Sequence, residues 1–215
     1  NKKRILITAG PTHEKIDPVR YISNYSSGKM GYALAEELAN LGARVTLISG
    51  PTNLLLNHPN IEIIDVEQAD EMYKQCKSRF KNMHGAILAA AVADYKPKKA
   101  SGEKIKGSGK ELTLELEPTT DIAREMGKMK KKNQFLAGFA LESENELENA
   151  RSKLKKKNFD FIVLNSLKNK GAGFQYDTNK ISIIDKNNNL TNFKLKLKKD
   201  AAIDIINKIA EIIGE

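Results

Sequence analysis

Residues 17–31, DPVRYISNYSSGKMG, combine a cation, a neutral amide and closely spaced small residues. Arg20 offers a planar guanidinium with several donors, and Asn24 offers an amide that donates without carrying charge. The segment follows a β-branched run and precedes a helical pattern, and it is far longer than the roughly 2–6 residues usual between a strand and a helix. Long loops within compact domains tend to be functional, so this segment is the first candidate for a binding site.

The end of this segment, SSGKMG, is typical of a helix start that binds a phosphate or another oxyanion. Ser26 and Ser27 fall where N-cap residues are expected, and Gly28 and Gly31 leave the backbone uncovered. Free backbone N–H groups and the partial positive charge of the helix N-terminus would then face the anion. For Ser-Gly-x-x-Gly alone, a glycine-tolerant helix start beside a structural arginine is an equally good interpretation.

Further polar candidates follow other strand-like or helical patterns. Asp94 comes just after the small apolar run AILAAA at residues 86–91, and there it could hold a ribose hydroxyl or Mg²⁺, or cap a turn. Residues 119–121, TTD, form a helix-capping signature and a second candidate anion site. Lys153 and Lys157, four residues apart, border an apolar helical stripe and could reach a phosphate or face solvent.

The patterns around these candidates predict strands and helices in alternation. Such alternation indicates one α/β domain spanning residues 1–215, Rossmann-like and doubly wound with a mainly parallel sheet. Ligands of such sheets bind beyond the carboxyl ends of the strands. Strands are expected at Arg4–Ala9, Arg44–Ser49 and residues 61–66, 86–91, 134–140, 159–164, 180–185 and 190–195, and helices at residues 29–41, 69–80, 119–130, 144–157 and 200–213.

Lysines are concentrated in one glycine-rich segment. Six lysines and one glutamate lie between residues 96 and 110, which gives +5 of the net charge of +9. We interpret this segment as a lid over a small polyanion, in preference to a nucleic-acid-binding arm or a solvated face. In residues 103–106 and 112–116 apolar side chains alternate with polar or charged ones, which predicts the two strands of a projecting β-ribbon. Such ribbons often pair subunits.

Composition excludes several classes of protein. No apolar run approaches 18 residues and no leader pattern opens the chain, so we expect a cytoplasmic protein without a membrane span. Cys76 is the single cysteine and falls on a helical packing pattern, while three scattered histidines show no metal-ligand spacing.

Several motifs then occur in one order: ITAGPT, DPVRYISNYSSGKMG, AAAVADY, EKIK, TTDI, GFALE and NSL...GFQYDTN. Together, from about Ile5 to Ile183, they resemble phosphopantothenoylcysteine synthetases. The resemblance implies a ligase of coenzyme A biosynthesis that joins 4'-phosphopantothenate to L-cysteine with CTP. The reaction would pass through an acyl-cytidylate, releasing pyrophosphate and then CMP.

The resemblance further implies a homodimer that uses Mg²⁺. In bacteria a flavin-dependent decarboxylase commonly precedes the ligase, but nothing in this chain resembles it, so no flavin is expected here. The chain is then either a monofunctional synthetase or a fragment of a protein with a fused or associated decarboxylase domain. His13 stands where this family often has an arginine, which leaves its contact open.

Residue roles follow from the same resemblance. Asn24 would act on the acyl-cytidylate and Lys104 would serve its formation. Attack of a carboxylate on a phosphate needs charge neutralisation above all, which lysines and Mg²⁺ supply. Arg20, Ser26, Ser27, Gly28 and Gly31 would lie beside the substrate; Ala89, Ala90, Asp94, Lys104, Thr120, Asp121, Ile122, Ala123, Phe139, Lys153 and Lys157 would bind CTP, with Asp94 also the candidate metal ligand.

Two other classes of function remain as alternatives. A nicotinamide-dependent oxidoreductase on the same fold is disfavoured, because no G-x-G-x-x-G follows the first strand and no acidic residue ends the second strand at Ser49. A basic nucleic-acid-binding module would bind duplex with a steep dependence on salt.

Overall fold

The computed structural model describes residues 2–107, 109, 111–166, 173 and 176–214. Within these residues one eight-stranded sheet has the order β13-β12-β10-β9-β6-β1-β4-β5. The six strands from β10 to β5 are parallel, and β12 and β13 extend the sheet in antiparallel fashion. The strands are β1 (Arg4–Ala9), β4 (Arg44–Ser49), β5 (Ile61–Asp65), β6 (Gly85–Leu88), β9 (Phe135–Glu142), β10 (Phe161–Ser166), β12 (Ile181–Asp185) and β13 (Leu190–Asn192).

The order of the parallel strands reverses direction beside β1. From β1 the chain first builds outward through β4 and β5, then returns to the other side of β1 and builds through β6, β9 and β10. This is the Rossmann-type, doubly wound order, so the predicted fold is confirmed. A ligand is expected where the order reverses, at the carboxyl ends of β1 and β6.

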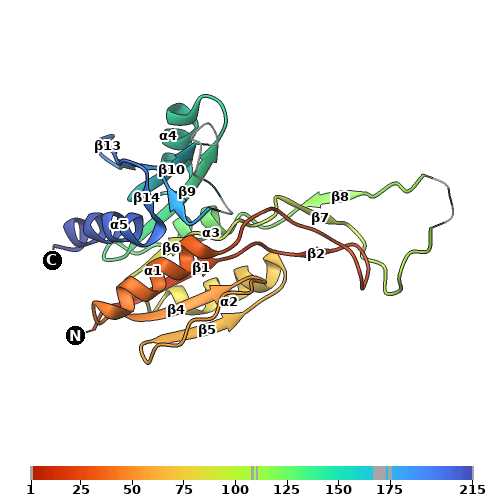
Figure 1. Cartoon of the computed structure of the whole chain (residues 1–215). Helices are drawn as coiled ribbons and strands as arrows, with labels where there is room; N and C mark the ends of the chain where they lie inside the picture. Colours follow the sequence, from red (N-terminus) through yellow and green to blue (C-terminus); the bar gives the residue numbers. More distant parts are fainter. Residues whose placement is uncertain (1, 108, 110, 167–172, 174–175, 215) are drawn as a thin grey trace.

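Helices cover both faces of the sheet (Figure 1). The helices α1 (Lys29–Asn40) and α5 (Lys198–Ile213) pack on one face, and α2 (Ala69–Phe80), α3 (Ile122–Met129) and α4 (Glu146–Lys156) pack on the other. Because both faces are buried, the central strands are apolar on both sides: Ile5 and Ile7 of β1 face α1 and α5, while Leu6 faces the opposite core. None of the helices in the described residues is long and apolar enough to cross a membrane.

A long arm projects from the body between β6 and α3 (Figure 1). At its base β7 (Tyr95–Pro97) pairs antiparallel with β8 (Leu116–Pro118), and the Lys98 N–H continues the pairing to the Glu115 carbonyl at 2.9 Å. The predicted projecting ribbon is therefore confirmed. Its strands, however, are β7 and β8 at the base of the arm, so the predicted strands at residues 103–106 and 112–116 are wrong. Farther out on the arm Leu112 and Leu114 are exposed, so no other part of the described residues covers this apolar side, and a lone two-stranded ribbon is marginal in water.

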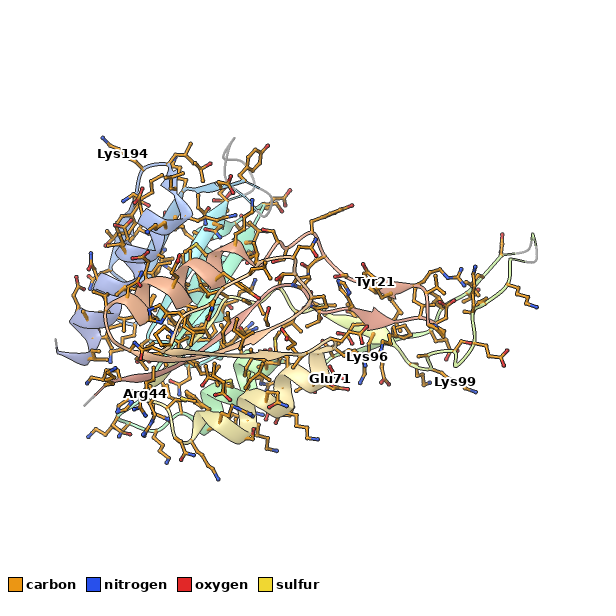
Figure 2. The ribbon with its side chains drawn as sticks, turned by 60° about the horizontal axis from the view of Figure 1, so that its bottom comes forward. Tyr21, Arg44, Glu71, Lys96, Lys99 and Lys194 are labelled. Atoms are coloured by element: carbon orange, nitrogen blue, oxygen red, sulfur yellow. The ribbon has the colours of Figure 1, made fainter. Side chains whose placement is uncertain are left out.

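Two short strand pairs complete the described structure. The hairpin β2 (Glu14–Lys15) and β3 (Tyr21–Ile22) follows β1 and lies against the arm, where the Ser101 N–H donates to the Ile16 carbonyl at 2.9 Å. Figure 2 shows Tyr21, Lys96 and Lys99 on the arm side of the molecule and Arg44 at the far end of the body. The other pair is β11 (Thr178–Asn179) with β14 (Lys196–Leu197). Ser108 and Lys110 of the expected lid lie outside the described residues.

Candidate functional site

A cavity of about 600 Å³ opens at the carboxyl ends of β1, β6 and β9. It lies where the strand order reverses, as the fold leads us to expect. The structure brings most of the sequence candidates together in its wall: Asn24, Ser26, Ser27, Gly28, Gly31, Ala89, Ala90, Asp94, Thr120, Asp121, Ile122, Ala123, Phe139, Lys153 and Lys157.

The N-terminus of α1 forms one side of the cavity. Its N-cap is Gly28, with φ of 77°, so the prediction that Ser26 or Ser27 occupies the cap is wrong. The chain enters the helix through a left-handed backbone conformation that glycine adopts without strain, and Ser26 Oγ only accepts the Gly28 N–H at 3.4 Å. At Gly31 an added Cβ would lie 2.5 Å from Ala9 Cβ. The missing side chain therefore lets the first turn of α1 approach the end of β1.

Asn24 ties the long loop to the segment that follows β6. Its Nδ2 donates to the Ala91 carbonyl, and its Oδ1 accepts the Ser26 N–H at 3.0 Å. Both ends of the amide are thus engaged by backbone, which fixes the orientation of the side chain. The result is a neutral donor held at the cavity wall.

The strand β6 ends earlier than predicted, at Leu88 instead of residue 91. Beyond it the backbone turns toward β1: the Ala89 N–H donates to the Thr8 carbonyl at 3.2 Å and the Ala90 N–H donates to Thr8 Oγ1 at 3.2 Å. The threonine hydroxyl replaces a strand partner and bends the chain away from the ladder. Two small alanine side chains line the cavity there, and they leave room for a ligand.

The helices α3 and α4 supply a wall with positive charge. Asp121 caps α3 by accepting the Arg124 N–H at 3.0 Å, which confirms the predicted capping signature. The Lys157 ammonium lies 3.1 Å from the Asp121 carboxylate, and the Lys153 ammonium lies 2.5 Å from Glu142. Each lysine is therefore oriented by a carboxylate while it lines the cavity.

Arg20 and Lys104 do not line the cavity. The Arg20 guanidinium donates to the Asp17 carboxylate at 3.0 Å and to the Ile105 carbonyl at 2.8 Å. Asp17 is 2% exposed and also accepts the Ile105 N–H at 3.1 Å. The guanidinium holds the pKa of Asp17 well below its usual range. This pair fixes the arm next to Lys104, whose side chain is exposed.

Sequence reasoning missed five polar residues of the cavity wall: Thr8, Lys29, Asn165, Asn179 and Lys198. Asn165 and Asn179 belong to the quoted motif NSL...GFQYDTN and Lys29 to DPVRYISNYSSGKMG, but none was singled out. The motif residues Leu167, Phe174 and Gln175 lie outside the described residues. Lys198 carried no signal, because it is one of many lysines in the C-terminal part of the chain. Its place in the wall depends on β12 and β13, which carry the chain back to α5.

Asp94 is the candidate ligand for a divalent cation. Within the described ranges no three aspartate, glutamate, histidine or cysteine side chains cluster as a metal site would require. Asp94 is exposed in the cavity wall. Mg²⁺ is commonly bound by one or two carboxylates together with substrate phosphates and water. Asp94 therefore fits a magnesium ion that arrives with a phosphorylated substrate.

Known proteins similar in sequence match nearly the whole of this chain. The coenzyme A biosynthesis bifunctional protein CoaBC of Bacillus subtilis (strain 168) is 45% identical over 210 residues, which cover 98% of this chain and 52% of that protein. A protein named cysteine/cysteine sulfinic acid decarboxylase, from an unknown prokaryotic organism, is 55% identical over 213 residues, covering 99% of this chain and 59% of that protein. The chain thus spans little more than half the length of these relatives.

A solved structure matches nearly the whole chain. The crystal structure of the C-terminal domain of CoaBC superposes with a TM-score of 0.83 at 40% identity, over 99% of this chain and 96% of that one. Residues 1–213 also match the family model for the DNA/pantothenate metabolism flavoprotein C-terminal domain. The chain therefore belongs to the DNA/pantothenate metabolism flavoprotein C-terminal domain family.

Proposed function

We propose that this chain is a phosphopantothenate–cysteine ligase that activates its acid substrate with CTP. The observation that carries the proposal is the single cavity in which a helix N-terminus, a fixed neutral amide, an exposed aspartate and two lysines meet. The 45% identity to a coenzyme A biosynthesis protein supports the same conclusion. All of these groups suit a reaction between anions, in which charge neutralisation matters more than acid or base catalysis.

The reaction has two steps. In the first, the carboxylate of 4'-phosphopantothenate attacks the α-phosphate of CTP, and the bond to pyrophosphate breaks. In the second, the amine of cysteine attacks the acyl carbon, the bond to CMP breaks, and the amine loses a proton. Lys153 and Lys157 would neutralise the triphosphate, and Mg²⁺ held by Asp94 would supply further positive charge.

Asn24 suits the second step. A neutral amide can donate to the acyl oxygen as negative charge develops there, without trapping the substrate carboxylate as a cation would. Its two backbone contacts hold the group in place, so little reorganisation is needed. On the far wall, half-buried Phe139 offers an apolar surface for the cytosine ring, beside the small Ala89 and Ala90.

We further propose that the protein works as a homodimer through its arm. Large apolar side chains are unusually exposed on the arm and on the adjacent hairpin, and a second subunit would cover them. Lys104, the proposed residue for acyl-cytidylate formation, is exposed on this arm and outside its own cavity, which supports a site that two chains share. The exposed residues are Val19, Tyr21, Tyr95, Leu112, Leu114 and Leu116.

The test is a reconstituted reaction. The protein is incubated with 4'-phosphopantothenate, L-cysteine, CTP and Mg²⁺, and pyrophosphate, CMP and the ligated product are measured, with ATP as the comparison nucleotide. We expect all three products and poor activity with ATP. Parallel assays measure CO₂ release from cysteine, NADPH binding and duplex DNA binding. A positive result in one of these without pyrophosphate release would reject the ligase.

The shared site is tested by complementation between two inactive variants. Asn24→Asp and Lys104→Gln are mixed under conditions that allow the subunits to exchange. If the two residues meet across the dimer, mixed dimers regain one complete site and activity returns. No recovery despite proven exchange would place both residues in one chain.

A further inference from the structure

Two lysines of the cavity wall have no part in the ligase described so far. Lys29 begins α1 and Lys198 begins α5, and these helices pack side by side on one face of the sheet. Both lysines line the same cavity as Lys153 and Lys157, but they come from the opposite face of the sheet. The cavity therefore has two pairs of cations, one from each helical layer.

Lys198 is unusually buried for a lysine, with 7% of its surface exposed. Its ammonium donates to the carbonyls of Gly173 at 3.0 Å and Tyr176 at 2.5 Å, which fix its position in the wall. Burial, and to a lesser extent the neighbouring charge of Lys29, lower the pKa of Lys198 to about 8, although the charge of Asp177 acts in the opposite sense. The charged form is thus electrostatically disfavoured in the ligand-free protein.

A dianion bound in the cavity would favour the charged form of Lys198 over the neutral form. Lys29 is held by Asp177 at 2.6 Å, but this ion pair is largely exposed on the aspartate side and contributes little stability. A phosphoryl oxygen near both lysines would relieve their mutual repulsion and favour the charged form of Lys198. Lysine ammonium groups commonly bind phosphate in this way, as point charges with several donors.

We propose that Lys198, together with Lys29, binds a phosphoryl group of a substrate at a subsite separate from Lys153 and Lys157. The inference rests on the proposed ligase, which has two substrates that carry phosphate. The group is either the 4'-phosphate of phosphopantothenate or a phosphate of the CTP triphosphate. Both present the same chemistry to the lysines, and the experiment separates them.

The main variant is Lys198→Met, which keeps most of the length of the unbranched side chain and removes the charge. The matched control is Lys199→Met: Lys199 is the next residue, pairs with Glu37 at 3.3 Å, and its side chain is 62% exposed. It does not line the cavity. Lys198→Arg restores the charge and should recover part of any loss. Unfolding temperatures of all variants establish that the fold is intact.

Two kinetic measurements identify which substrate supplies the bound phosphate. A charge-assisted hydrogen bond contributes about 1.5–3 kcal/mol, so we expect kcat/KM to fall roughly 10- to 100-fold in Lys198→Met and to stay unchanged in Lys199→Met. If the 4'-phosphate is the ligand, the variant loses its preference for phosphopantothenate over pantothenate. If the triphosphate is the ligand, KM rises for CTP and inhibition by pyrophosphate weakens.

A binding experiment tests the subsite without enzyme turnover. Calorimetric titration with inorganic phosphate and with pyrophosphate should show weaker binding to Lys198→Met than to Lys199→Met. Above pH 8 the wild-type affinity should fall by up to about tenfold per pH unit, because binding then requires Lys198 to take up a proton. This proton uptake should be absent from Lys198→Met, while Lys29 and Asp177 remain in both proteins.

The outcomes distinguish the subsite from the ligase. Equal phosphate and pyrophosphate binding by folded Lys198→Met and Lys199→Met, with unchanged kinetics, would overturn the subsite. Loss of stability alone would mean that Lys198 only anchors the segment at Gly173 and Tyr176. If Lys198→Met does not fold, Lys29→Met takes its place in the kinetic measurements and in the comparison of phosphate and pyrophosphate binding. Absence of ligation by the wild type would reject the ligase but leave the binding comparison decisive.

Discussion

The first prediction concerns the contact between α1 and β1 that sets one side of the cavity. In Gly31→Ala the new Cβ would lie 2.5 Å from Ala9 Cβ, 3.1 Å from Ala9 Cα and 3.2 Å from the Thr8 carbonyl oxygen. Carbon atoms in contact prefer separations of about 3.5–4.0 Å. Helix and strand must therefore separate by roughly 1 Å, a shift comparable to this mismatch. The strand cannot yield freely, because β1 lies between β4 and β6 in the sheet.

Two effects of opposite sign decide the size of the change. Overpacking of a well-packed contact costs about 1–3 kcal/mol. Alanine is a better helix former than glycine by up to about 1 kcal/mol. The nearest atom is a methyl fixed directly to the strand, and the next two are backbone atoms of the strand, so overpacking should win. We expect the free energy of unfolding to fall by about 1–2 kcal/mol.

The assay is urea unfolding followed by circular dichroism, in a double-mutant cycle with Ala9→Gly. Removing the Ala9 methyl removes the nearest contact and leaves only the two atoms beyond 3 Å. The double variant should therefore lose less stability than the two single variants add up to, by about 1 kcal/mol. Full stability of Gly31→Ala, or strict additivity in the cycle, would refute the close contact.

Three further predictions address the proposed chemistry and its support. Lys157→Met should raise KM for CTP about 5- to 30-fold, less than a full charge-assisted bond, because Lys157 must first leave Asp121; Lys155→Met on the same helix is the control. Asn24→Asp should still form acyl-cytidylate in a rapid-quench experiment but consume it slowly, since a carboxylate repels the developing oxyanion; no intermediate would contradict this order of steps. For Asp17→Asn, the stability deficit relative to wild type should be constant at neutral pH and shrink below about pH 4, because the lowered pKa of Asp17 stabilises the fold only while the carboxylate is ionised; a deficit independent of pH would refute the ion pair with Arg20.

The central strands were predictable because they are buried on both faces. The bounds of β1 and β4 agree with the sequence prediction at both ends, since RILITA and RVTLIS are continuous apolar or β-branched runs that need cover on each side. The two strands of the ribbon were misplaced because the predicted segments are not buried between layers. Residues 103–106 alternate well, but alternation predicts a strand only where a neighbouring layer covers the apolar face.

The site was predictable where its residues lie at the ends of strands and the starts of helices. Asn24, Asp94 and Asp121 each follow or precede a strong periodic pattern, so their meeting at one sheet edge follows from the topology. The N-cap at Gly28 was not predictable from residue preference alone, because the left-handed backbone there depends on how the loop returns over β1. Lys198 depends on contacts between residues far apart in the chain, such as Lys29 and Asp177.

The ligand-free pairing of the cavity lysines bears on which anions the site selects. Lys29 is held by Asp177, Lys153 by Glu142 and Lys157 by Asp121. A ligand carboxylate would replace one singly charged partner by another and gain little. A phosphoryl group carries a charge of about −1.5 to −2 at neutral pH and offers three acceptor oxygens, so it gains from the same exchange. Because these ion pairs are partly exposed and individually weak, the exchange itself is easy. The pairing therefore favours phosphorylated over carboxylate ligands at each lysine, which would leave the carboxylate of the proposed substrate free to react.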